Sequence, residues 1–169
     1  VHYYREQSPD ELALINYTSG TTGNSKGVMI PYRAMWSNAD FARSVLGETV
    51  KPGSHIISIL PMAHMYGMAF ELIFEFIAGA HVFYLTRMPS PAIIAQALAE
   101  VKPALMIAVP LIIEKIIRKR VFPKIQTNRM KLLLNTPVIQ KKVKEKICEQ
   151  VMQAFGGNIY QVIIGGAAL

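Results

Sequence analysis

Short apolar runs alternate with segments of helical spacing along most of this chain. The runs are bounded by glycine, proline or polar residues, a pattern that is typical of buried strands. We expect strands at Leu12–Tyr17, Val28–Ile30, Ile56–Leu60, Val82–Leu85, Leu105–Val109 and Tyr160–Ile164. Because strands that are apolar on both faces need cover on both sides, the pattern predicts an α/β fold whose mostly parallel sheet carries helices on both faces.

Between these runs, apolar side chains recur with the spacing of one helix face. One predicted helix follows Pro31, and another has Pro137 at its first position and Gly156 beyond its end. The stretch Phe122–Asn135 predicts a loop, or a short strand around Lys131–Leu134. Further helices are expected at Leu72–Ala78, Ala92–Val101 and Leu111–Val121.

The composition fits one globular domain over residues 1–169. Apolar residues make up 51% of the chain, which excludes a disordered or fibrous protein. The single cysteine, Cys148, provides no disulfide framework, and the first residues lack the basic-then-apolar pattern of a signal peptide. No run reaches the ~18 apolar residues that a membrane span needs. A cytoplasmic protein is the expectation.

The net charge of +7 is concentrated in one tract. Eleven of the eighteen Lys and Arg residues lie between Lys115 and Lys146, and only Glu145 opposes them there. Such a tract can contact phosphates or an anionic membrane surface, but it is more often a solvated helix face. Since the tract lacks a series of aromatic side chains for base stacking, we expect no nucleic acid partner and leave peripheral membrane contact open.

The richest candidate chemistry lies in the segment Asn16–Gly27, which reads NYTSGTTGNSKG and joins two predicted strands. A Walker loop opens a helix and has another spacing, and a dinucleotide fingerprint needs a closer glycine pair, so both motifs are excluded. The glycines allow backbone N–H groups to converge on an anion. The hydroxyl groups of Thr18, Ser19, Thr21 and Thr22 add donors, and Lys26 adds positive charge. The segment predicts a phosphate-binding loop, with a polar hairpin loop as the alternative.

Several motifs carry a resemblance to the adenylate-forming superfamily, which includes acyl-CoA synthetases, peptide-synthetase adenylation domains and beetle luciferases. YTSGTTGNSKG at Tyr17–Gly27 resembles its phosphate-loop signature, and LPMAHMYG at Leu60–Gly67 resembles its L-P-x-x-H-x-x-G block. IIGGAAL at Ile163–Leu169 resembles its glycine-rich segment on the adenine side. KPALMIAVPLIIEKI at Lys102–Ile116 is similar to the V-P-x-x-x-E-K region of long-chain fatty acyl-CoA ligases, and GGAAL favours the same branch.

The resemblance implies a fatty acid–CoA ligase that uses Mg-ATP to form an acyl-adenylate and then transfers the acyl group to coenzyme A. It implies that Thr18 helps to hold Mg²⁺ and that His64 faces the acyl-adenylate near the carboxylate. Spacing alone favours a hydrogen-bonded structural histidine beside Pro61 at position 64, and the resemblance reverses that preference. The implied catalytic residues are His64 and Lys26. The implied ATP-binding residues are Thr18, Ser19, Gly20, Thr21, Thr22, Gly23, Lys26, Gly165, Gly166, Ala167 and Ala168.

The resemblance also implies parts that follow the glycine-rich segment in such enzymes. These are a metal-binding Glu, a ribose-binding Asp and a small C-terminal domain with an adenylation Lys. We therefore expect residues 1–169 to be a fragment of the AMP-binding N-terminal domain, inactive alone and partnered by that C-terminal domain. The alternatives are an adenylating enzyme for an aryl or amino acid, and a non-catalytic nucleotide-binding module.

Overall fold

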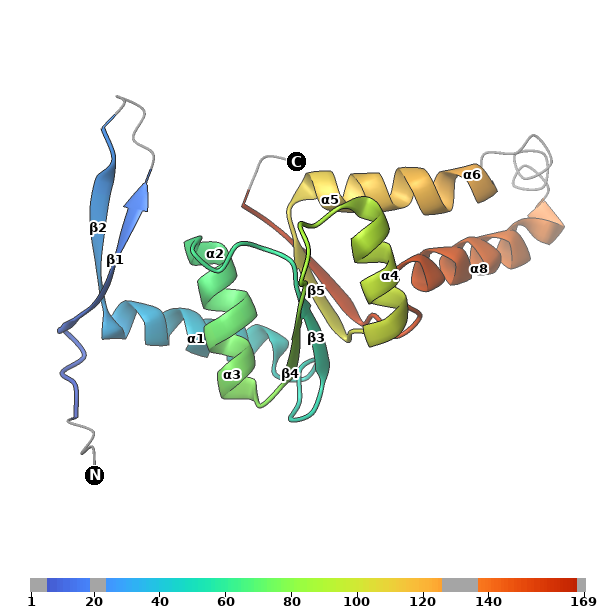
Figure 1. The fold of residues 1–169 in the computed structure, drawn as a ribbon. Coiled ribbons are helices and arrows are strands. Elements are labelled where there is room, and N and C mark those ends of the chain that lie inside the picture. Colours follow the sequence, from blue (N-terminus) through green and yellow to red (C-terminus); the bar gives the residue numbers. More distant parts are fainter. Residues whose placement is uncertain (1–5, 19–23, 126–136, 167–169) are drawn as a thin grey trace.

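The computed structural model describes residues 6–18, 24–125 and 137–166, and it confirms the predicted alternation of strands and helices (Figure 1). The strands are β1 (Leu12–Thr18), β2 (Lys26–Pro31), β3 (His55–Ser58), β4 (His81–Tyr84), β5 (Leu105–Ala108) and β6 (Gln161–Ile164). The α-helices are α1 (Tyr32–Leu46), α2 (Met65–Gly67), α3 (Phe74–Ala78), α4 (Pro91–Val101), α5 (Pro110–Ile116), α6 (Phe122–Ile125) and α8 (Pro137–Ala154). Two π-helical segments, η1 (Met68–Ile73) and η2 (Ile117–Val121), continue α2 and α5.

The core is a parallel sheet with the strand order β4-β3-β5-β6. Alternate residues of the central strands enter two different clusters. Ile57 and Met106 pack with apolar residues of α4, α5 and α8, whereas Ile56 and Leu105 pack with residues of α1 and α3. Figure 1 shows these two sets of helices on opposite sides of the sheet. The predicted α/β class, with helices on both faces, is confirmed.

Strands β1 and β2 form a separate antiparallel hairpin, which projects beyond the start of α1 in Figure 1. The strand predicted at Leu12–Tyr17 is therefore confirmed, but it lies outside the parallel sheet. Its apolar side chains stay partly in solvent, with Tyr17 71% and Met29 68% exposed. Because a two-stranded ribbon has little core of its own, its position depends on contacts with the rest of the protein.

The helical segment after His64 begins earlier than the apolar spacing predicts. The sequence predicts a helix only over residues 72–78, whereas α2, η1 and α3 form one continuous helical stretch from Met65 to Ala78. Glu71 and Glu75 interrupt the apolar pattern, although both side chains are completely buried. The helix ends at Gly79, whose φ of 68° is the left-handed conformation that glycine adopts readily.

At the C-terminal end of the chain, α8 has Pro137 at its start and ends before Gly156, as predicted. Val143 is buried on its inner face. The stretch predicted as a loop from Phe122 begins instead with the short helix α6, and the strand considered around residues 131–134 lies outside the described residues.

Candidate functional site

The predicted site residues that the structure describes lie beyond the carboxyl ends of parallel strands or at the loop end of the hairpin. Strand β3 leads into the loop Ile59–His64, and β6 leads into Gly165 and Gly166. In open α/β sheets, ligands bind in the crevice at this edge, because the loops that leave the strands there can surround them. The fold thus places two of the predicted motifs at the edge where a ligand is expected.

A hydrogen bond joins the hairpin to the loop that carries His64. The side-chain amide of Asn16 donates to the backbone carbonyl of Ala63 at 3.1 Å, across 47 positions of sequence. Asn16 belongs to β1, two residues before Thr18, and Ala63 immediately precedes His64. The bond therefore holds the hairpin, with its predicted phosphate loop, against the second predicted motif.

Thr18 and Lys26 face each other across the end of the hairpin. They are directly paired in the antiparallel register, and both are exposed. Side chains of directly paired residues project on the same face of the ribbon, so the hydroxyl and the ammonium group border one surface. Residues Ser19, Gly20, Thr21, Thr22 and Gly23, between them, lie outside the described residues.

His64 is exposed and precedes the first turn of α2. Its backbone N–H donates to the carbonyl of Pro61 at 3.0 Å, and its own carbonyl accepts from the N–H of Met68 at 2.9 Å. The imidazole has no hydrogen-bond partner among the described residues, so the hydrogen bonds that fix His64 are those of its backbone. Neither ring nitrogen is therefore occupied by a residue that the structure describes.

The second and third predicted motifs meet through Tyr66. A Cβ atom on Gly165 would lie 2.8 Å from the Tyr66 hydroxyl oxygen, so a larger residue at this position would require the Tyr66 side chain to shift. Gly166 has a φ of 77°, the left-handed conformation that favours glycine. The predicted residues Gly165 and Gly166 therefore border the segment that carries His64, while Ala167 and Ala168 lie outside the described residues.

Sequence reasoning did not single out Tyr66 as a site residue. Its hydroxyl is buried and has no partner among the described residues. Burial raises the pKa of Tyr66, and the charge of Glu71 adds to the shift. The side chain lines a cavity of about 370 Å³, which is largely apolar and reaches Phe41 on α1 and Ile163 on β6. Its place inside LPMAHMYG is the only sequence signal that points to it.

Two buried carboxyl groups lie one helical turn apart behind this site. Glu71 accepts hydrogen bonds from the Ser58 hydroxyl and from two backbone N–H groups, whereas neither oxygen of Glu75 has a partner among the described residues. Burial raises the pKa of Glu71 to about 7. Burial, with the nearby charge of Glu71, raises the pKa of Glu75 to about 8. Of the two carboxyl groups, Glu75 has the higher pKa and keeps its proton to the higher pH.

A family model described as AMP-binding enzyme matches residues 2–166 of the chain. The chain belongs to this family. Long-chain-fatty-acid–CoA ligase 3 of Saccharomyces cerevisiae is 31% identical over 186 residues, covering 95% of the chain and 25% of the yeast protein. Long-chain-fatty-acid–CoA ligase 2 of Schizosaccharomyces pombe is 25% identical over 177 residues, covering 95% of the chain and 26% of that protein. The chain thus spans about a quarter of the length of these relatives.

Solved structures of adenylate-forming enzymes have the same fold as this AMP-binding segment. The adenylation domain of a carboxylate reductase from Mycobacterium chelonae aligns with a TM-score of 0.67 and 26% identity, covering 97% of the chain and 24% of that domain. ATP-bound MatB from Rhodopseudomonas palustris aligns with a TM-score of 0.65 and 22% identity, covering 99% of the chain and 26% of that protein. The fold of these proteins confirms the predicted architecture.

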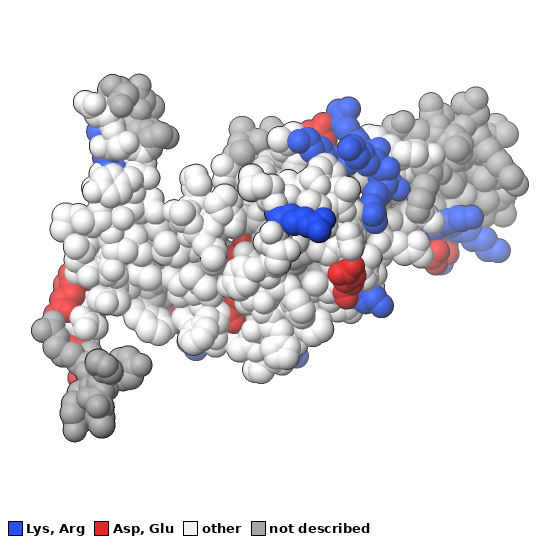
Figure 2. Space-filling model, viewed as in Figure 1, with Lys and Arg blue, Asp and Glu red and all other residues white. Residues whose placement is uncertain are grey.

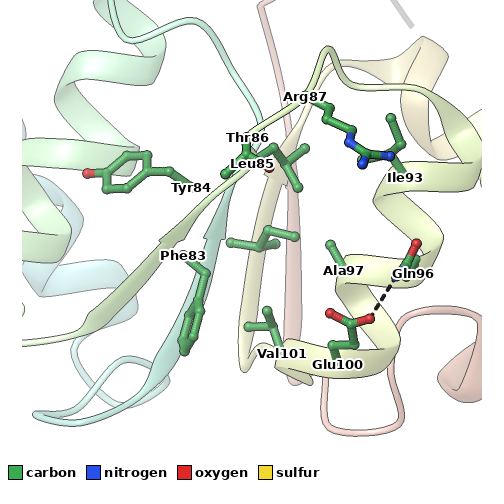
Figure 3. Close-up of a pocket in the computed structure, with 11 residues that line it drawn as sticks. Phe83, Tyr84, Leu85, Thr86, Arg87, Ile93, Gln96, Ala97, Glu100 and Val101 are labelled. Carbon is green, nitrogen blue, oxygen red and sulfur yellow. Dashed lines mark hydrogen bonds between the residues drawn. The ribbon is translucent and has the colours of Figure 1, made fainter.

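Two further cavities of the AMP-binding segment flank β4. The cavity in Figure 3, of about 360 Å³, lies between β4 and α4, and Gln96 on its wall donates to Glu100 at 2.9 Å. None of the predicted site residues that the structure describes lines it. The other, of about 600 Å³, is bordered by Ser58–Met62 and Tyr84–Pro89 at the carboxyl ends of β3 and β4. This second cavity adjoins the loop that carries His64.

The basic tract forms an exposed surface wherever the structure describes it. Lys115, Arg118, Lys119 and Arg120 are all exposed on α5 and η2, and Arg118 pairs with Glu114 at 2.8 Å. Figure 2 shows Lys and Arg side chains gathered over this part of the molecule. Among the helices that the structure describes, none is long and apolar enough to cross a membrane.

Replacement of Gly67 by alanine should destabilise the protein. Alanine usually stabilises a helix relative to glycine, but a Cβ atom here would lie 2.6 Å from the carbonyl oxygen of Pro61. Because the obstacle is backbone, relieving it must move the His64 loop, at a cost of about 1–3 kcal/mol. Urea denaturation of the complete polypeptide checks the sign, and a more stable Gly67→Ala variant would show that the loop does not press on the helix.

The buried carboxyl pair should make stability fall as pH rises. A carboxyl with its pKa raised to about 8 keeps, when folded, a proton that the unfolded chain releases above about pH 4.3. The stabilisation from this proton is fully present below about pH 4.3. Between that pH and about pH 8, the free energy of unfolding should fall by about 1.4 kcal/mol per pH unit. Glu75→Gln should remove much of this slope in urea midpoints, whereas Glu149→Gln, at an exposed position of α8, should retain it.

Proposed function

We propose that this chain is part of an ATP-dependent fatty acid–CoA ligase that forms an acyl-adenylate before transferring the acyl group to coenzyme A. The observation that carries the proposal is the meeting of three motifs. Asn16 joins the phosphate-loop hairpin to Ala63, and Tyr66 contacts the glycine-rich segment at Gly165. The match to long-chain fatty acid–CoA ligases over 95% of the chain supports a fatty acid as the substrate.

The hairpin residues fit a phosphate chain. Thr18 and Lys26 are exposed and directly paired, so a hydroxyl and a mobile cation border the same surface. Lys26 would bind the β- and γ-phosphates and neutralise charge on the pyrophosphate that leaves. The Thr18 hydroxyl is an oxygen ligand of the kind that Mg²⁺ prefers, and Mg²⁺ bound there would draw further charge from the phosphates. Positioning and charge stabilisation are what displacement at phosphorus mainly needs.

His64 would act at the carboxylate of the fatty acid. Its imidazole is exposed, has no described partner, and is fixed through backbone bonds at the carboxyl edge of β3. There it would stabilise charge as the carboxylate attacks the α-phosphate. Gly165 and Gly166, in contact with Tyr66, would allow the adenine and the acyl group to approach the backbone.

The test is carboxylate-dependent pyrophosphate release from Mg-ATP by the complete polypeptide that contains these residues. A panel of fatty acids is compared with aryl acids, amino acids and malonate, and acyl-CoA formation is followed separately. Turnover with fatty acids, followed by thioester formation, is the expected result. Preference for another acid would indicate a different adenylating enzyme, and ATP binding without turnover on any acid would indicate a non-catalytic nucleotide-binding module.

Lys26→Ala should weaken nucleotide binding with little loss of stability. Lys26 is exposed, and surface substitutions away from the core usually change stability by less than about 0.5 kcal/mol. Loss of a hydrogen bond to a charged group costs about 1.5–3 kcal/mol, so affinity for Mg-ATP should fall roughly 10- to 100-fold. The shift in melting temperature that Mg-ATP produces measures this loss. Lys51→Ala, at an exposed lysine after α1, is the control, and an unchanged ATP shift in Lys26→Ala would contradict the proposed role.

A further inference from the structure

The carboxylate of Glu71 accepts hydrogen bonds from the residues at the carboxyl end of β3. Its Oε2 atom accepts from the Ser58 hydroxyl at 2.8 Å, from the Leu60 N–H at 2.9 Å and from the Ile59 N–H at 3.1 Å. Ser58 is the last residue of β3, and Ile59 and Leu60 are the first two beyond it. The donors at the end of β3 and just beyond it thus bind one buried side chain in place of a neighbouring strand.

The segment that Glu71 holds leads directly to His64. Leu60 is followed by Pro61, and the carbonyl of Pro61 accepts from the His64 N–H at 3.0 Å. The bond from Asn16 to Ala63 fixes the other end of the same loop. The contact at the strand end is made by the carboxylate of Glu71, which has no exposed surface. Water therefore cannot replace the hydrogen bonds that this carboxylate accepts.

A carboxylate satisfies this arrangement with both of its oxygens, since Oε1 adds a longer contact of 3.3 Å to the Ile59 N–H. Two N–H groups and a hydroxyl converge on it, and both oxygens of an ionised Glu71 are acceptors. An amide offers one acceptor oxygen, and its NH₂ group would face at least one donor. Glu75 provides a natural comparison, because it is equally buried one turn later in the same helical stretch and has no described partner. The two carboxyl groups differ in their contacts with the loop.

Two opposing effects act on the pKa of Glu71, and together they raise it to about 7. Hydrogen bonds from Leu60, Ser58 and Ile59 lower its pKa against the larger opposing effect of burial. Glu75 and Tyr66 are the titratable groups that interact with it from α3 and α2, and the pKa of Glu75 is the higher of the two carboxyl values. The charged and imidazole side chains of α1 and β3 lie at the surface: Arg33, Asp40, Arg43 and His55.

We propose that Glu71 is a positioning residue for adenylate formation, which holds Ser58, Ile59 and Leu60 so that the following loop presents His64 to the carboxylate substrate. The same three residues border the cavity of about 600 Å³ at the carboxyl ends of β3 and β4, so Glu71 also fixes one wall of that space. The catalytic consequence rests on the proposed ligase function. The structural consequence, a loop held in place by one carboxylate, can be measured independently of it.

The test compares Glu71→Gln with Glu75→Gln in the complete polypeptide. Glu71→Gln should lower kcat for fatty-acid-dependent pyrophosphate exchange at least ~10-fold, while KM for ATP stays within about twofold. Hydrogen exchange at the amides of Ile59 and Leu60, followed by mass spectrometry, should accelerate in the same variant. Glu75→Gln should leave kcat and this exchange close to the parent values, because it removes no bond to the loop.

The results separate this inference from the proposed function. If the parent enzyme shows no turnover on any acid, the ligase proposal fails, and exchange at Ile59 and Leu60 alone decides whether Glu71 holds the loop. If Glu71→Gln does not fold, Ser58→Ala takes its place, because it removes one donor and should lower kcat and accelerate exchange in the same way. Unchanged exchange, or equal losses of kcat in the Glu71 and Glu75 variants, would overturn the positioning role.

Discussion

Residues 1–169 alone should release no measurable pyrophosphate from Mg-ATP and a fatty acid, whereas the complete polypeptide should turn over. The chain spans about a quarter of the length of its long-chain fatty acid–CoA ligase relatives. By resemblance, the metal-binding Glu, the ribose-binding Asp and the adenylation Lys belong to later segments. Removal of one preorganised donor costs about 10²- to 10³-fold in rate, and here several are removed together.

The measurement is fatty-acid-dependent pyrophosphate release by the purified segment, with the complete polypeptide as the positive control. The melting temperature of the segment, with and without Mg-ATP, shows in parallel whether a folded nucleotide site is present. Turnover by residues 1–169 that disappears in Lys26→Ala would show that the segment is sufficient for catalysis. That result would remove the need for the later segments, although the ligase chemistry itself would stand.

The parallel sheet could be predicted from the sequence because its strands are buried on both faces. Ile56 and Ile57 are adjacent yet enter different clusters, and Leu105 and Met106 do the same. Such strands appear in the sequence as continuous apolar runs between polar or glycine-rich boundaries. The strand of the hairpin at Leu12–Tyr17 has similar composition, so composition alone could not show that it pairs only with β2.

The helical stretch from Met65 and the buried hydrogen bonds of Glu71 could not be predicted from spacing. Periodicity assigns a carboxylate to solvent, since a buried charge is unfavourable unless donors surround it. The donors of Glu71 come from the end of β3, a different element, and become neighbours only after folding. The bond between Asn16 and Ala63 could not be predicted either, because its partners are 47 positions apart in the sequence.

The motifs, in contrast, could be found from the sequence because their residues are contiguous. Thr18, Lys26, His64, Gly165 and Gly166 all lie at the hairpin end or at the carboxyl edge of the sheet. Their roles toward ATP and the acid remain predictions. Tyr66 was missed because its contact with Gly165 joins two motifs that are almost 100 positions apart, which the sequence of either motif does not reveal.

His64→Ala should slow acyl-adenylate formation by about 10²- to 10³-fold and leave ATP affinity nearly unchanged. The imidazole has no hydrogen-bond partner in the part of the chain that the structure describes, so its removal breaks no hydrogen bond there. The backbone bonds of residue 64 to Pro61 and Met68 do not involve the side chain and survive the substitution. Carboxylate-dependent pyrophosphate exchange by the complete polypeptide measures the effect, and the ATP-induced shift in melting temperature measures binding.

His81→Ala is the matched control, because His81 is also exposed but begins β4 at the opposite, amino edge of the sheet. Its exchange rate should equal that of the parent. A structural histidine at position 64 would instead lower the melting temperature in proportion to the loss of exchange. Equal exchange rates in His64→Ala and the parent would exclude His64 from the chemistry. Since Glu71 is inferred to act through the position of His64, adding Glu71→Gln to His64→Ala should then slow exchange by much less than it does in the parent.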